Sequence, residues 1–157
     1  MPPTHAASDL VLVSWIASIP GLTAAGVGTQ LPPDDTTWAA SGYVVVPTTF
    51  GGTPHSTIPL RRPIGQVDCW AVIPGSGTPP WGLATDLAEQ IRFATYDRTR
   101  FGRPLTVTLN GVAYPGARVL SVKILTEMRR AYGDTADYAC VSFDLAFQWI
   151  QPGEVIP

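Results

Sequence analysis

The sequence predicts a single α+β domain: a mainly antiparallel β-sheet flanked by two α-helices, with a β-hairpin and long Pro/Gly-rich loops. Three observations predict it. An apolar stripe recurs at helical spacing between residues 80 and 96, apolar and polar residues alternate from residue 139 to 149, and an Asn-Gly pair separates two β-rich runs. Strands grouped together with helices outside the group are typical of an antiparallel sheet with helices packed against it.

The first expected element is a helix over about residues 9–19. Ser8 is placed to cap this helix, and Asp9 suits the positive N-terminal end of its dipole. Pro20-Gly21 ends it, and residues 22–40 show no clean period. The side of the helix expected to face the core consists of Leu10, Val13, Ile16 and Ala17.

Two strands and a long loop follow. Residues 43–46 predict a short strand that Pro47 stops, and residues 48–60 predict an extended loop used for contact. A second strand is expected over about residues 64–73, followed by a Pro/Gly break. Alternation gives this strand two faces: Val67, Cys69, Ala71 and Ile73 on one, and Gln66, Asp68 and Trp70 on the other.

The second helix is expected over about residues 80–96. Thr78 is a candidate cap, and prolines suit the first turn because their missing N–H groups need no partner there. Asp86 lies early and Arg92 late, as the helix dipole favours. The apolar stripe consists of Leu83, Leu87, Ile91 and Ala94.

The last third predicts β-structure. Residues 105–109 and 112–114 form a hairpin across Asn110-Gly111, and residues 119–128 form another strand. A turn over residues 129–137 leads into the cleanest alternation of the chain. Its apolar face consists of Ala139, Val141, Phe143, Leu145, Phe147 and Trp149, and its polar face of Cys140, Ser142, Asp144 and Gln148.

Composition narrows the class of protein. A chain of 157 residues fits one domain with a real core, and 45% apolar residues exclude a disordered chain. Charged residues make up 14%, against roughly 25% in soluble domains. This shortage suggests a surface covered by neighbouring subunits, although a stable Pro- and Gly-rich monomer is the alternative. The net charge of −2 gives no overall attraction to nucleic acid or an anionic membrane.

Cysteine usage and hydropathy predict folding in a cytoplasm. Cys69 and Cys140 form no CxxC or Cys/His cluster, so we expect buried, reduced thiols rather than a cross-strand disulfide. No charged segment followed by an apolar one opens the sequence, and no apolar run approaches about 18 residues. We therefore expect no membrane partner.

Known catalytic motifs are absent from the sequence. Gly75-Ser-Gly-Thr precedes a helix, as anion sites do, but it lacks a P-loop lysine and is better explained as a connection. His5 and His55 lie in loop-like segments, and Asp68 and Asp144 are more simply explained as solvated acids than as a carboxylate pair. We expect no catalytic residue, no metal and no cofactor, and a protein that is not an enzyme.

Arginines and two tryptophans remain as candidate interface residues. Arg61 and Arg62, and likewise Arg129 and Arg130, lie at element ends, where each is a solvated charge or a partner for carboxylates on a neighbouring subunit. Arg98, Arg100 and Arg103 present the same choice. Trp70 lies on the polar face of its strand and Trp81 at a helix start, so each is an interface anchor or packs under a loop.

An N-terminal helix, the strand Pro63-Ile-Gly-Gln-Val-Asp-Cys-Trp-Ala, a Gly/Pro break, an Ala-rich helix and a C-terminal β run together resemble a known family. These residues are similar to the tail terminator proteins of long-tailed (siphovirus-type) bacteriophages, over roughly residues 10–150. The long Pro-rich region 30–59 departs from that pattern. The domain expected from the resemblance covers residues 1–157, with flexible termini at 1–7 and 151–157.

The resemblance implies a structural virion protein that assembles in the host cytoplasm. Such proteins form a homo-hexameric ring that caps the tail tube, ends tube polymerisation and joins the tail to the head. The implied partners are copies of the same chain, the major tail tube protein and a head-side connector or stopper protein. Genome DNA passes through the ring without specific binding.

A ring needs two different matching faces on each subunit. We expect one face at residues 48–59 with Arg61 and Arg62, and the other at the turn 129–137. The alternatives are another neck component, such as a head-closure or head–tail adaptor protein, and a small non-enzymatic bacterial binding domain.

Overall fold

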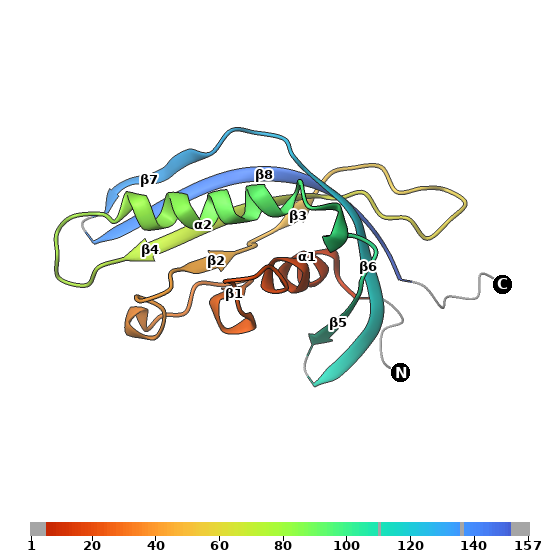
Figure 1. Ribbon diagram of the computed structural model, residues 1–157, viewed down its shortest axis with the longest axis horizontal. Coiled ribbons are helices and arrows are strands. Elements are labelled where there is room, and N and C mark those ends of the chain that lie inside the picture. The colour runs from red at the N-terminus through yellow and green to blue at the C-terminus, as the bar shows by residue number, and fades with distance from the viewer. Residues whose placement is uncertain (1–5, 110, 136, 152–157) are drawn as a thin grey trace.

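A computed structural model describes residues 6–109, 111–135 and 137–151. It confirms the expected α+β class: two α-helices and a mostly antiparallel sheet (Figure 1). The helices are α1 (Ser8–Ala17) and α2 (Trp81–Ala94), and the 3-10 turns are η1 (Ala24–Gly26), η2 (Asp35–Thr37) and η3 (Arg98–Arg100). The strands are β1 (Val27–Gly28), β2 (Tyr43–Val45), β3 (Thr49–Phe50), β4 (Ile64–Val72), β5 (Pro104–Leu109), β6 (Val112–Ile124), β7 (Arg129–Thr135) and β8 (Tyr138–Ile150).

Strand β8 is the centre of the sheet. The strand order is β1-β2-β4-β8-β6-β5, with β3 paired to β4 and β7 paired to β8. One edge of β8 pairs with β4 without interruption, from Ala146 opposite Ile64 to Tyr138 opposite Val72. The other edge pairs first with β7 and then with β6, so three strands depend on β8.

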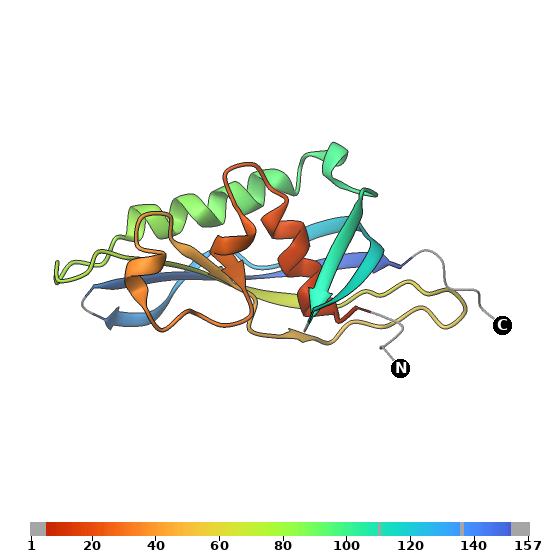
Figure 2. The same ribbon diagram turned by 90° about the horizontal axis from the view of Figure 1, so that it is seen from below.

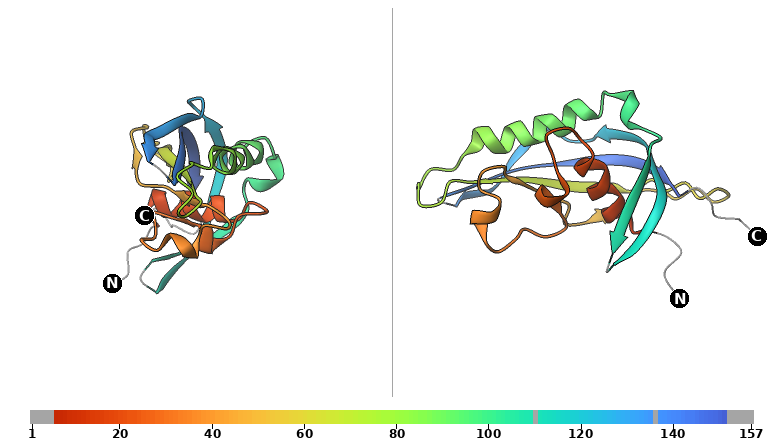
Figure 3. Two further views of the ribbon diagram at one scale, coloured as in Figure 1. Left: turned by 90° about the vertical axis from the view of Figure 1, so that its left-hand side faces the viewer. Right: turned by 60° about the horizontal axis from the view of Figure 1, so that its bottom comes forward.

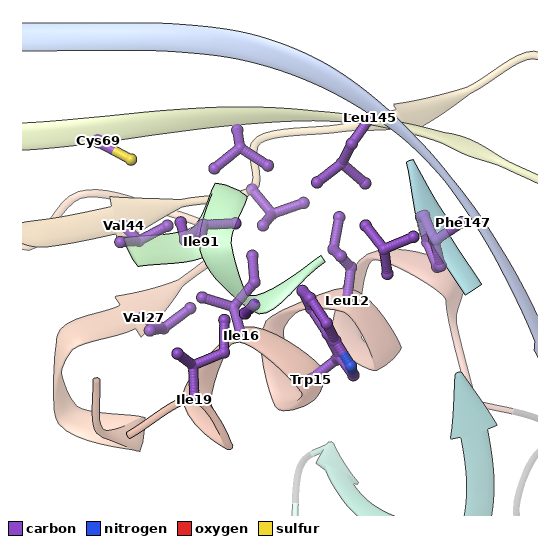
Figure 4. Packing of buried hydrophobic residues seen from close by; sticks show 14 of the residues in the cluster. Leu12, Trp15, Ile16, Ile19, Val27, Val44, Cys69, Ile91, Leu145 and Phe147 are labelled. Carbon is purple, nitrogen blue, oxygen red and sulfur yellow. The ribbon is translucent and has the colours of Figure 1, made fainter. Parts of the chain in front are cut away.

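Both helices cover one face of this sheet, called here the helix face (Figure 2). The alternation predicted for β8 is confirmed, because its apolar residues are at most 3% exposed on that face. Figure 4 shows Leu12 and Ile16 of α1 and Ile91 of α2 in the same core as Leu145 and Phe147 of β8. Each such side chain, fully buried, contributes roughly 1.5–3 kcal/mol.

Helix α2 follows its predicted pattern and α1 does not. The buried side of α2 contains Leu87, Ile91 and Ala94, and Leu83 is partly buried. In α1 the buried residues are instead Val11, Leu12, Trp15 and Ile16. Because seven of the ten residues of α1 are apolar, spacing alone does not select a face. The large ring of Trp15, stacked on Phe101 at 6.0 Å, selects it instead.

The expected helix caps are wrong. Ser8 is the first residue of α1, Ala7 occupies the cap position, and the Ser8 hydroxyl accepts a hydrogen bond from Trp149 Nε1 at 3.0 Å. Pro80 occupies the cap position of α2, without a side-chain cap from Thr78. Tertiary contacts outweigh capping here, since the buried indole N–H of Trp149 needs an acceptor.

The expected strands at 112–114 and 119–128 are one strand, β6, which ends at Ile124. Residues 115 and 116, a Pro-Gly pair, lie opposite the single residue Thr106, between the pairs Leu105–Ala117 and Val107–Tyr114. An extra residue of this kind is a β-bulge, which accommodates a proline without N–H. The predicted hairpin is confirmed by the Leu109–Val112 pair, with Gly111 at a φ of 79°, whereas Asn110 lies outside the described residues.

The turn expected at 129–137 is also wrong over most of its length, because β7 pairs along β8 there. The segment has no apolar alternation, so the free edge of β8 rather than its own sequence makes it a strand.

At the chain ends, the Ala6 N–H donates to Gln151 Oε1 at 3.1 Å. The flexibility expected for residues 1–5 and 152–157 concerns residues outside those described. No described helix is long and apolar enough to span a membrane.

The packing of Leu12 in α1 against Gly65 in β4 predicts a stability effect. A Cβ added at Gly65 would lie 2.5 Å from Leu12 Cδ2 in the core. We expect Gly65→Val to lower the free energy of unfolding by about 1–3 kcal/mol through overpacking. A Cβ at Gly82 in α2 meets nothing within 4 Å. Gly82→Ala is therefore the matched control, expected to be neutral or stabilising by up to about 1 kcal/mol. Equal losses for both variants in urea unfolding would contradict this packing.

Candidate interaction surfaces

Residues 51–60 form an arm that projects from one end of the molecule (Figure 1, right). Residues 51–59 are all exposed, and Ile58 keeps 50% of its surface accessible. The hydrogen bonds of the arm are local: the His55 N–H donates to the Leu60 carbonyl at 3.1 Å, and the Thr57 N–H to His55 Nδ1 at 3.2 Å. The arm therefore has its own shape without packing on the body.

The base of the arm is held by β3, Gly52 and Arg61. Gly52 has a φ of 73°, and a Cβ there would overlap the backbone of Arg62. Arg61 exchanges two backbone hydrogen bonds with Trp149, at 2.9 and 3.0 Å, and its guanidinium lies 5.3 Å from the Trp149 ring centroid. Arg61 is thus engaged within its own chain, although Arg61 and the neighbouring Arg62 are both exposed.

The structure brings Trp81 and Arg130 together. Arg130 pairs with Val141 in the β7–β8 ladder, so it points to the helix face, where its guanidinium lies 4.5 Å from the Trp81 ring centroid. This cation–π contact links the first residue of α2 to β7. Arg129 has other partners, Asp144 Oδ1 at 4.0 Å and Thr126 Oγ1 at 3.3 Å. The predicted interface residues at this end therefore already have partners in their own chain.

Trp70 lines a pocket on the face opposite the helices. This aromatic pocket, about 350 Å³, is formed by Leu31, Pro32, Pro33, Trp38, Trp70 and Tyr138. The Tyr138 ring lies 6.4 Å from Trp70 and 6.2 Å from Trp38. Sequence reasoning missed Trp38 and Tyr138 as site residues. The pair Pro32-Pro33 shortly before Trp38 was the sequence signal that could have indicated this pocket. Residues 22–40 have no periodic pattern, however, so the sequence does not show which part of the sheet they pack against.

Two carboxylates, Asp34 and Asp35, follow the lining residue Pro33 directly in the sequence. The Tyr138 hydroxyl donates to Asp35 Oδ2 at 2.7 Å, and this hydrogen bond, with some burial, raises the pKa of Tyr138 above its usual range. Asp34 accepts from the Thr36 N–H at 3.1 Å and from its hydroxyl at 2.6 Å. Because the Tyr138 hydroxyl already has a partner, the walls offer mainly ring faces and proline carbons.

Asp68 is buried, which corrects the expectation of a solvated acid. It is 3% exposed and accepts from Ser142 Oγ at 2.6 Å and from Gln66 Nε2 at 3.1 Å. Asp144 is half-buried and faces Arg129. The two carboxylates therefore take different partners. Register explains the burial of Asp68, because Ser142 lies directly opposite it in the β4–β8 ladder.

The glycine-rich connection after β4 binds a carboxylate of its own chain. The Gly75 and Gly77 N–H groups donate to Asp137 Oδ2 and Oδ1 at 2.9 and 2.7 Å. These bonds lower the pKa of Asp137. The prediction that this segment connects a strand to a helix is confirmed. The N–H groups of the segment bind the carboxylate of Asp137.

Apolar surface is also exposed at the end of α2. Phe93 and Tyr96 are each 69% exposed, and neither was a predicted site residue. Among residues 6–109, 111–135 and 137–151, no group of three or more His, Cys, Asp or Glu side chains is placed to hold a metal ion. His55 lies on the exposed arm, and His5 falls outside the described residues.

The chain matches no family model and no curated protein. A solved structure of the virion of a native gene transfer agent (GTA) particle contains a chain with a similar fold. The two chains share 12% identity with a TM-score of 0.50, and the alignment covers 86% of this chain and 84% of that one. At this identity the likeness shows a common fold across nearly the whole domain.

Burial predicts that both thiols are inert. It raises the pKa of Cys140 to about 12, with a further contribution from the Asp68 charge, and raises that of Cys69 well above its usual value. At pH 8 the thiolate of Cys140 is roughly a thousandfold rarer than that of an ordinary cysteine. We expect neither thiol to react with a disulfide reagent in the native protein, and both to react in denaturant. Rapid labelling of the folded protein would contradict the burial of these residues.

Proposed function

We propose that this protein is a structural component of a phage-type virion and, more specifically, a tail terminator. The observation that carries the proposal is the fold, which matches a chain of a virion particle over 86% of this protein. The resemblance of the segment from Pro63 to Ala71 to tail terminator proteins supports the finer assignment. In this role the protein forms a ring, expected to be hexameric, that ends tail tube polymerisation and meets the head-side connector.

The surfaces of the subunit suit a ring better than a catalyst. The buried carboxylate Asp68, the two thiols and the hydroxyl of Tyr138 are engaged or buried, as is usual for structural polar groups. The projecting arm, in contrast, is exposed at one end of the molecule, and the segment 31–38 between β1 and β2, which lines most of the aromatic pocket, lies toward the other end. Different surfaces at different ends are what a closed ring of identical subunits needs. We therefore propose a non-enzymatic role.

The proposed lumen needs no specific DNA contact. With a net charge of −2, the chain lacks the overall attraction to phosphates that dominates nucleic-acid affinity. Passing DNA is then not held by the ring. The proposed partners are copies of this chain, the major tail tube protein and the head-side connector or stopper protein.

Ring formation and tube capping test the proposal. Mass photometry of the protein with the tail tube protein of the same genome should show a closed oligomer, and electron microscopy should show tubes that stop growing when it is added. A protein that stays monomeric and leaves tube length unchanged would contradict the terminator assignment. Binding to the head-side connector without any effect on tubes would instead favour an adaptor.

Charge reversal at the arm base tests the proposed surface. We expect Arg62→Glu to weaken self-association by about tenfold or more, because the reversal places like charges against each other across the interface, and about 1.4 kcal/mol of repulsion already corresponds to tenfold. Arg103→Glu is the control, because Arg103 is also exposed but lies just before β5, outside residues 51–63 and outside the pocket lining. Unchanged association of Arg62→Glu would remove Arg62 from the interface.

A further inference from the structure

We propose that the arm of one subunit inserts into the aromatic pocket of the next, with Ile58 as the anchoring side chain. This inference rests on the proposed ring, because it names the two surfaces that join one copy to another.

The arm is shaped for docking before it meets a partner. The base of the arm is fixed at Gly52 and Arg61, and its tip is closed by the His55–Leu60 hydrogen bond. Pro54 and Pro59 restrict the backbone on either side of the exposed Ile58. A segment that is already ordered loses little entropy on binding, so contact with a complementary pocket is favoured.

The pocket has the chemistry to receive such a tip. Its walls are the rings of Trp38, Trp70 and Tyr138 together with Leu31, Pro32 and Pro33. Aromatic walls of this kind accept proline and aliphatic side chains, because flat rings pack closely against rigid apolar groups. A volume of about 350 Å³ leaves room for Ile58 with its neighbour Pro59.

The opposite charges of the arm and of the pocket segment favour a second copy of this chain as the occupant of the pocket. Residues 51–63 contain Arg61, Arg62 and His55 but no acidic residue, and residues 31–38 contain Asp34 and Asp35 but no basic one. Three residues lie between Ile58 and Arg62, and even a fully extended chain would span at most about 14 Å between them. Arg62 is therefore within reach of Asp34 and Asp35, called here the acidic rim, when Ile58 lies in the pocket.

The placement of the two surfaces excludes closure within one subunit. The arm lies at one end of the long axis, and η2, which carries the acidic rim, lies toward the other in every side view (Figure 1, Figure 3 right). The contact therefore joins different copies through different surfaces. A heterologous contact of this kind generates a ring where the rotation between neighbouring subunits closes.

Directed disulfide formation tests the contact. Ile58→Cys and Pro33→Cys are placed on separate, differently tagged copies, since Pro33 is exposed at the pocket and the native thiols are buried. We expect the mixed pair to form a covalent dimer on mild oxidation. Ile58→Cys mixed with Val112→Cys is the control, because Val112 is exposed on the β5–β6 hairpin. A mixed pair no more abundant than the control pair overturns the proposal.

A charged residue at position 58 of the arm distinguishes a failure of the docking contact from a failure of the proposed function. Because Ile58 is exposed, Ile58→Asp should fold normally by circular dichroism yet weaken self-association at least about tenfold, while Val112→Asp leaves it unchanged. Rings that form equally well with Ile58→Asp overturn the docking contact and leave the terminator role standing. If the directed disulfide forms but the wild-type protein has no effect on tail tubes, the docking contact stands and the terminator role is overturned.

Discussion

The backbone hydrogen bonds of β8 place almost every other part of this protein. Its one edge holds β4 along nine consecutive pairs, and its other edge holds β7 and then β6. Its apolar side chains face both helices, so the same strand also supplies the floor of the core. Buried backbone groups in a sheet must be paired, which fixes the register of these strands as a unit.

This arrangement gives two carboxylates partners within the chain. Asp68 is bonded to Ser142 because β4 and β8 are in register, and Asp137 closes the glycine-rich connection at the start of β8. The arm projects at one end of the molecule, and the segment 31–38 between β1 and β2, which lines most of the aromatic pocket, lies toward the other end (Figure 1). The proposed function accordingly relies on contacts with other chains.

The parts of the fold that could be predicted are those with a strong local period or turn signal. The alternation of residues 139–149, the stripe of α2 and the Gly111 hairpin each carry their own structural information. Strand β7 and the buried face of α1 could not be predicted, because the free edge of β8 and the packing of Trp15 decide them. Only tertiary structure shows these constraints.

The candidate site was predicted in part, for similar reasons. The exposed arm follows from its Pro/Gly-rich composition, and Trp70 from its place on the polar face of β4. The pocket around Trp70 needs residues 31–38 and Tyr138, which come together only through η2 and the first residue of β8. Trp81 and Arg130 were both predicted, but their contact with each other depends on the unpredicted β7.

Electron cryomicroscopy of the oligomer bound to the end of a tail tube tests the central claim most directly. The account predicts a closed ring at the tube end, in which residues 51–60 of each subunit enter the pocket formed by Trp38, Trp70 and Tyr138 of its neighbour. A ring joined through other surfaces, with every arm free, would contradict the arm-and-pocket contact. Tubes without any ring at their ends would contradict the assignment as a tail terminator.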